Sequence, residues 1–165
     1  MIVDDSLPQV ILGDEVRLGQ ILHNLMSNAV KFTRNGSITL KISLEKIQGE
    51  EATVYFSVTD TGVGIEKEKQ VLIFDRFTQA SVDIAREFGG SGLGLAIVKQ
   101  LAALHNSDIY LNSEPGRGST FFFTINFKTG KQEAPQQQTT NGKNDLSGIK
   151  AVSYTHLTLP TKRIV

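Results

Sequence analysis

Apolar residues recur with the spacing of an amphipathic helix in several parts of the chain. The longest set follows Asp14, whose carboxylate suits a helix N-cap, and ends before Gly36. Its members are Leu18, Ile21, Leu22, Leu25, Met26, Ala29 and Val30. A second amphipathic helix is predicted over residues 93–104, and a short helix from Glu66 to Ile73.

Other stretches alternate between apolar and polar residues, as half-buried strands do. These stretches are residues 38–44, 54–58, 108–112 and 120–127. The first two predict strands around a polar turn near Gly49, which places Asp60 at the end of a strand. The last two predict a hairpin across residues 114–118. Because strands and helices alternate too rarely for a doubly wound parallel sheet, the pattern favours a mixed α/β domain.

Composition divides the chain into one domain and less regular segments. With 165 residues, the chain is long enough for one ordinary domain and a tail. We expect the domain to cover residues 1–128, with a polar, mobile loop between Asp75 and Gly92. Residues 129–144 are rich in Gln, Thr and Lys, which predicts a flexible linker.

The charge balance and the cysteine count exclude several functional classes. The chain carries 17 basic and 17 acidic residues, so no net charge favours nucleic acid or an anionic membrane. It has no cysteine, hence no disulfide, which fits a reducing compartment. No apolar run approaches the roughly 18–20 residues of a membrane span, and the N-terminus is no signal peptide. We expect a soluble, cytoplasmic piece without membrane contact; an inner-membrane anchor in a parent protein stays open.

Two asparagines and two glycine clusters indicate a nucleotide site. Asn24 and Asn28 lie one helical turn apart on one face of the predicted helix. Their amide oxygens are hard ligands of the kind that Mg²⁺ accepts beside waters and phosphates. The glycine clusters, at residues 60–64 and 89–94, allow backbone N–H groups to approach phosphates closely.

Five sequence blocks, taken in order, resemble the ATP-binding catalytic domain of bacterial sensor histidine kinases, from about Val10 to Phe127. The blocks are Asn24-x-x-x-Asn28-Ala29-x-Lys31-Phe32-Thr33, Asp60-x-Gly62-x-Gly64, Phe74-x-Arg76-Phe77, Gly90-Ser91-Gly92-Leu93-Gly94-Leu95 and Gly116-x-Gly118-Ser119-Thr120. The resemblance implies the Bergerat fold. This is a two-layer α/β sandwich in which a mixed sheet carries helices on one face, and ATP lies between the helices and a flexible lid.

The resemblance also implies how MgATP is held. Asn28 would give its side-chain oxygen to Mg²⁺, and Asn24 would hold the metal or its waters. Lys31 would bring an ammonium toward a phosphate. Asp60 would accept a hydrogen bond from the exocyclic amine of adenine, and Thr120 would reach the adenine side through its hydroxyl or a water.

Further ATP contacts are implied for the glycine segments. Gly62 and Gly64 would let the chain bend beneath the base, with Ile65 beside them. Backbone N–H groups at the start of the following helix favour phosphate oxygens. The residues of that segment are Gly90, Ser91, Gly92, Leu93 and Gly94. Phe77, in our interpretation, either contacts ATP or anchors the lid in the core.

Each of these residues also has a purely structural interpretation. Taken alone, Asn24 is a solvated helix residue, Lys31 a surface charge and Asp60 a turn former. The presence of all five blocks reverses that preference for Asn28, Asp60 and Gly92, and does so less for Asn24 and Thr120.

The implied activity is transfer of the γ-phosphoryl group of ATP to a histidine on a separate helical dimerisation domain, in two-component signalling. His23, His105 and His156 do not resemble the phosphoacceptor motif, so that domain and a downstream receiver domain or response regulator are the expected partners. Related ATPases place a glutamate, as base for water, where this chain has Asn24, which disfavours hydrolysis. The alternatives are a non-catalytic nucleotide-binding regulatory module and, less favoured, an ATPase of this fold.

The C-terminal residues require a separate interpretation. Residues 145–151 resemble the entry to a receiver domain that is cut short, which predicts a fragment of a hybrid kinase. Residues 152–165 resemble translated read-through of a sequencing adapter, and a genuine disordered tail is the alternative. The genomic DNA would decide between the two.

Overall fold

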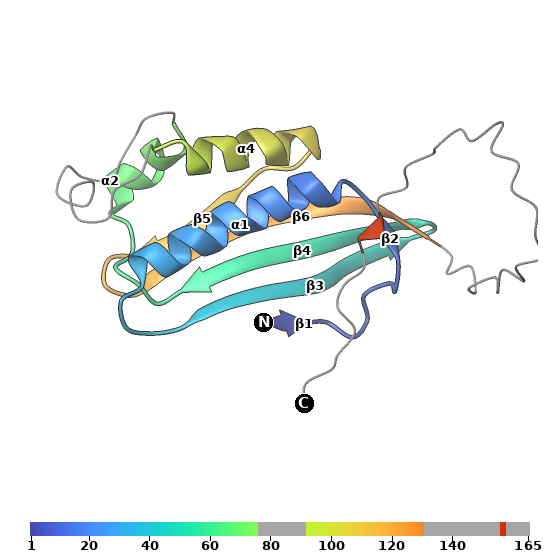
Figure 1. Ribbon diagram of the computed structural model, residues 1–165, viewed down its shortest axis with the longest axis horizontal. Helices are drawn as coiled ribbons and strands as arrows, with labels where there is room; N and C mark the ends of the chain where they lie inside the picture. Colours follow the sequence, from blue (N-terminus) through green and yellow to red (C-terminus); the bar gives the residue numbers. More distant parts are fainter. Residues whose placement is uncertain (76–91, 131–155, 158–165) are drawn as a thin grey trace, which may run out of the picture.

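The domain is built as a sheet with helices packed on one face. The computed structural model of the protein describes residues 1–75, 92–130 and 156–157. Figure 1 shows helices α1 (Glu15–Phe32) and α4 (Gly94–Leu104) on the same side of the sheet, where α4 packs beside α1. This is the two-layer α/β arrangement that the family resemblance implies.

The sheet is mixed, and its strand order is β1-β3-β4-β6-β2-β7, with β5 also paired to β6. The strands are β1 (Ile2–Val3), β2 (Ile11–Leu12), β3 (Ile38–Gln48), β4 (Glu51–Asp60), β5 (Tyr110–Glu114), β6 (Gly118–Thr129) and β7 (His156–Leu157). Strand β1 runs parallel to β3, whereas the other pairs are antiparallel. Both predicted hairpins, β3–β4 and β5–β6, are confirmed.

Helix α1 forms where the apolar spacing places it. The side chain of Asp14 caps it by accepting a hydrogen bond from the backbone N–H of Arg17, at 2.9 Å. Its buried face packs on β3 and β4 and consists of Leu18, Ile21, Leu25 and Ala29. Asn24 and Asn28 lie beside this face and are half-buried.

Alternate residues of the central strands fill the core beneath the helices. On β4 and β6 these are Ala52, Val54, Phe56, Val58, Phe121, Phe123, Ile125 and Phe127. The rings of Phe56 and Phe123 stack, with centroids 5.0 Å apart. Phe122 lies on the opposite face against Tyr55 and Tyr110, which confirms the alternation expected for the three consecutive phenylalanines.

The short helix predicted from Glu66 to Ile73 is divided in two. Helix α2 (Lys67–Gln70) is followed at once by a 3-10 helix, η1 (Leu72–Phe74). The division lets Ile73 reach the core and places the ring of Phe74 edge-on against Phe121, 6.4 Å between centroids.

Some predictions concern residues outside the described ranges, namely the loop and lid after Asp75, most of the linker, and the receiver-like segment 145–151. The tail predicted over residues 152–165 is described only at β7, which pairs with β2. Within the described part of the chain, no helix is both long enough and apolar enough to cross a membrane.

Candidate nucleotide-binding site

The two asparagines of α1 face the start of α4. A Cβ atom added to Gly94 would lie 3.6 Å from Oδ1 of Asn24 and 4.0 Å from Nδ2 of Asn28. The amide nitrogen of Asn24 donates to the backbone carbonyl of Gln20 at 3.0 Å, which leaves its oxygen facing the space in front of Gly94. Two amide side chains and a helix N-terminus therefore meet in one place.

The first turn of α4 offers backbone N–H groups to this place. Its N-cap residue, Leu93, makes no side-chain capping bond, and Gly92 before it has a φ of +69°. The first N–H groups of a helix have no partner inside the helix, and they attract anions. Asn24 turns its amide oxygen toward this place and Asn28 its amide nitrogen. An amide oxygen on α1 suits a Mg²⁺ ion, and the amide hydrogens on α4 suit a phosphate.

Asp60 ends β4 on the helix-covered face of the sheet and is 6 % exposed. One of its carboxylate oxygens accepts the backbone N–H of Gly62 at 2.9 Å. Burial raises the pKa of the Asp60 carboxyl above its usual 3.8, while the N–H groups of Gly62 and Ser119 partly oppose that rise. The result is a buried hydrogen-bond acceptor at the end of a strand.

A row of three polar residues crosses the sheet at Asp60. Asp60 pairs with Ser119 on β6, and Ser119 pairs in turn with Ser113 on β5. The hydroxyl oxygens of the two serines are 3.0 Å apart, and Ser119 is buried. Ser119 is therefore a candidate base-contacting residue that our sequence reasoning missed. The sequence does contain a signal for it. Ser119 lies two residues before Phe121 and four before Phe123, so all three side chains lie on the same, core-facing side of β6.

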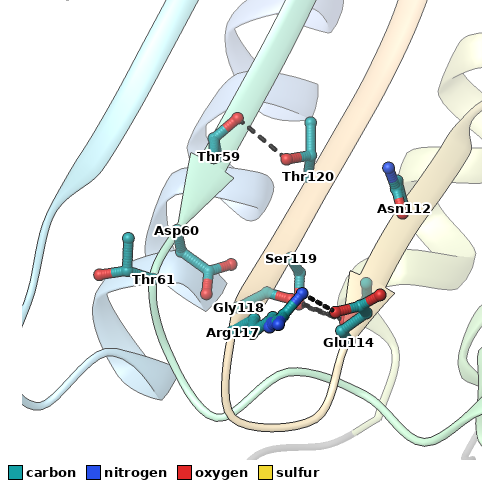
Figure 2. Close-up of a pocket in the computed structure, with 10 residues that line it drawn as sticks. Thr59, Asp60, Thr61, Asn112, Glu114, Arg117, Gly118, Ser119 and Thr120 are labelled. Atoms are coloured by element: carbon teal, nitrogen blue, oxygen red, sulfur yellow. Dashed lines mark hydrogen bonds and ion pairs between the residues drawn. The ribbon is translucent and has the colours of Figure 1, made fainter.

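Thr120, the residue predicted to reach the adenine side, lies on the other face of the sheet. Its hydroxyl is 3.1 Å from that of Thr59, and both belong to a second row with Asn112 (Figure 2). The structure thus brings Ser119, rather than Thr120, to the side of the sheet that carries Asn24 and Asn28. Adenine contact by Thr120 stays a prediction that this geometry does not support.

The loop after Asp60 needs its glycines because backbone atoms crowd them. A Cβ atom on Gly62 would overlap the carbonyl oxygen of Phe32 at the end of α1. A Cβ atom on Gly64, whose φ is +68°, would overlap the carbonyl oxygen of Glu114. The loop is thus wedged between α1 and the β5–β6 hairpin, and Val63 bonds both sides: its N–H donates to Phe32 and its carbonyl accepts from Gly116.

The other predicted site residues are placed as follows. Lys31 lies in the last turn of α1, with its ammonium 4.9 Å from the centre of the Phe32 ring. Ile65 packs against the core. Phe77, Gly90 and Ser91 lie outside the described residues.

A shallow hollow of about 330 Å³ lies at the strand ends (Figure 2). It is lined by both polar rows and by the turn that carries Glu114 and Arg117, which form an exposed ion pair at 2.8 Å. Among the described residues that line it, none belongs to α1 or α4. The hollow therefore lies at the end of the sheet that carries Asp60, and Asn24 and Asn28 are not among its lining residues.

Comparison with known families decides the relationship. The family model described as histidine kinase-, DNA gyrase B-, and HSP90-like ATPase matches residues 13–129. The chain belongs to this family.

Relatives in the family point to its histidine kinase branch. The histidine-protein kinase BarA of Escherichia coli K12 is 38% identical over 144 residues, which cover 86% of this chain and 16% of BarA. The autoinducer 2 sensor kinase/phosphatase LuxQ of Vibrio harveyi is 47% identical over 131 residues, 78% of this chain and 15% of LuxQ. The chain therefore spans about a sixth of the length of these relatives.

A solved structure has the same fold. The crystal structure of full-length ShkA in complex with AMPPNP matches with a TM-score of 0.62 and 40% identity, covering 78% of this chain and 25% of ShkA. The resemblance to histidine kinase catalytic domains and the two-layer α/β fold are both confirmed.

Proposed function

We propose that this domain binds MgATP and transfers its γ-phosphoryl group to a histidine of a helical phosphoacceptor domain. The observation that carries the proposal is the common location of three features on one side of the sheet: the amides of Asn24 and Asn28, the first turn of α4, and the buried carboxylate of Asp60. The ShkA complex with AMPPNP, an ATP analogue by its name, supports the choice of nucleotide.

Each group of the site would take a part of the nucleotide that fits its chemistry. The amide oxygens of Asn24 and Asn28 are neutral hard ligands, which would hold Mg²⁺ without adding negative charge beside a triphosphate. The N–H groups at Gly94 and the next residues would face the phosphates. Asp60 would accept from the amine of adenine, and Ser119 would offer a hydroxyl beside it.

Transfer to histidine is favoured over hydrolysis because the position four residues before Asn28, where related ATPases have a glutamate, carries no base. Asn24 occupies that position, and a carboxamide does not take a proton at neutral pH. Its nitrogen is also engaged by the carbonyl of Gln20. A bound γ-phosphoryl group would therefore be positioned and charge-stabilised, and it would await a nucleophile from another domain.

Labelling with γ-³²P ATP tests the proposal. The full chain is mixed with a helical domain that carries an acceptor histidine, and both labelled histidine and released phosphate are counted. We expect alkali-stable, acid-labile label on the partner, lost with Asn28→Asp, and little free phosphate. Rapid phosphate release without a labelled histidine would support the ATPase alternative. Nucleotide binding without either product would support a regulatory module.

A further inference from the structure

The backbone just after Gly64 is held by two side chains from different elements. The N–H of Ile65 donates to the hydroxyl of Ser113 on β5 at 2.8 Å. The side-chain nitrogen of Gln70, the last residue of α2, donates to the carbonyl of Ile65 at 2.9 Å and to that of Ser113 at 3.0 Å. We call these three hydrogen bonds the Gln70–Ser113 clamp.

The clamp depends on the chemistry of a primary amide. One nitrogen with two N–H donors serves two backbone carbonyls that belong to different segments. A glutamate at position 70 would have the same shape but, when ionised, only acceptors, so it would set a carboxylate against two carbonyl oxygens. Position 70 thus requires a side chain with hydrogen-bond donors, and the volume of glutamine alone is not sufficient.

The clamp is connected to Asp60 through the first two residues of β6. The hydroxyl of Ser113 lies 3.0 Å from the carbonyl of Gly118 and 3.0 Å from the hydroxyl of Ser119, which is the residue paired with Asp60. On the other side, Ile65 is joined to Asp60 by only the four residues of the glycine loop. The residues at the two ends of the glycine loop, Asp60 and Ile65, are therefore both held by the β5–β6 hairpin: Asp60 pairs with Ser119, and Ile65 donates to Ser113.

We propose that Gln70 and Ser113 are positioning residues for base recognition, which hold the glycine loop and Ser119 in the geometry that distinguishes adenine from other bases. The inference rests on the proposed nucleotide site at Asp60. Neither side chain needs to touch the nucleotide, since both act through backbone and hydroxyl groups that surround Asp60.

The test compares Gln70→Glu with Gln100→Glu in the full chain. Gln100 is an exposed residue of α4, so the control introduces the same charge by the same chemical change. Affinities for Mg²⁺ complexes of non-hydrolysable ATP and inosine triphosphate analogues are measured by calorimetry. We expect Gln70→Glu to weaken binding of the ATP analogue about tenfold, the effect of about one to two ordinary hydrogen bonds. The ratio of the affinity for the ATP analogue to that for the inosine analogue should fall as well. Gln100→Glu should behave as wild type.

A second pair of variants keeps the test decisive if Gln70→Glu fails to fold. Ser113→Ala should reduce the preference for adenine, and Ser113→Thr, which keeps the hydroxyl, should restore it. An unchanged preference in the folded variants, including an equal loss of both nucleotides, would overturn the inference but leave the proposed function intact. Absence of nucleotide binding by folded wild-type protein would refute the proposed function as well.

Discussion

Asp60 is a carboxylate enclosed by the end of the sheet, and its burial has opposite effects on stability and on binding. Because burial raises its folded-state pKa, Asp60 contributes to stability fully at pH values below its usual 3.8. That contribution is lost as the pH rises through the folded pKa. At neutral pH the buried charge therefore lowers the free energy of unfolding. It lies where the proposed adenine site requires a hydrogen-bond acceptor.

Replacing this charge should separate stability from binding. We expect Asp60→Asn to raise the melting temperature of the nucleotide-free protein, because the buried charge is removed. The same variant should bind the ATP analogue about 10–100-fold more weakly, because a hydrogen bond to a charged acceptor is lost. An amide can donate to the carbonyl of an inosine base, so affinity for an inosine nucleotide should fall less. Asp108→Asn, at an exposed position before β5, is the control. An Asp60→Asn variant that binds the ATP analogue normally would contradict the assigned role.

Acidification should weaken base recognition through the same group. Asp60 accepts two N–H···O bonds best when ionised, and its raised pKa brings its protonation closer to neutral pH than that of an exposed aspartate. We predict that the affinity ratio of wild type to Asp60→Asn falls as the pH is lowered from 7.5 toward 4.5. The ratio cancels titration of the nucleotide itself. A constant ratio would show that the charge of Asp60 does not matter.

At the scale of single residues, the sequence was sufficient where spacing alone places a side chain. Asn24 and Asn28 follow from helical periodicity, and Asp60 follows from the end of an alternating strand. Ser119 was not predicted, because neighbouring residues of a strand point to opposite faces of the sheet, and our prediction chose its neighbour Thr120. Only the pairing of β6 with β4 shows which of the two lies beside Asp60.

Among the elements, the glycine loop between β4 and α2 has a strict steric requirement. Gly64 and Gly49 have similar φ angles, +68° and +59°, but a Cβ atom on Gly49 meets nothing within 4 Å. We expect Gly49→Ala to cost about 1–2 kcal/mol of unfolding free energy through backbone strain alone. Gly64→Ala adds a clash with Glu114 and should cost about 1–3 kcal/mol more.

Chemical denaturation of the two alanine variants measures that difference directly. Equal losses of unfolding free energy would mean that the loop can move away from the β5–β6 hairpin at little cost. The same variants should differ in nucleotide affinity, with a loss confined to Gly64→Ala, because Gly49 lies at the far end of β4 from Asp60.

The longer elements were predictable because each repeats its pattern over many residues. Helix α1 and the two hairpins have buried faces that match most of their apolar positions, whereas Val30 near the end of α1 is 63% exposed. Strands β1 and β2 were not predicted, since two residues are too few to show alternation and both depend on pairing with distant strands. The division between α2 and η1 also depends on the core, which takes up Ile73.

At the scale of the whole molecule, the proposed phosphate site on α1 and the proposed base site at the end of β4 are joined by hydrogen bonds through the glycine loop. Helix α1 carries the asparagines, and the carbonyl of Phe32 at its end accepts the N–H of Val63 in the glycine loop. The same loop is bonded to the β5–β6 hairpin through Val63 and Ile65. We therefore expect the contacts to the metal and the contacts to the base to contribute together to a single affinity for the nucleotide.

Calorimetric titration of the full chain with a non-hydrolysable ATP analogue, with and without Mg²⁺, is the most direct test of this account. We predict that wild-type binding is strengthened by Mg²⁺, that Asn28→Asp loses this strengthening, and that Asp60→Asn loses affinity under both conditions. Asp108→Asn should bind as wild type does. Folded wild-type protein that fails to bind, or binding that neither site variant changes, would contradict a Mg²⁺-nucleotide site formed by α1, α4 and the end of β4.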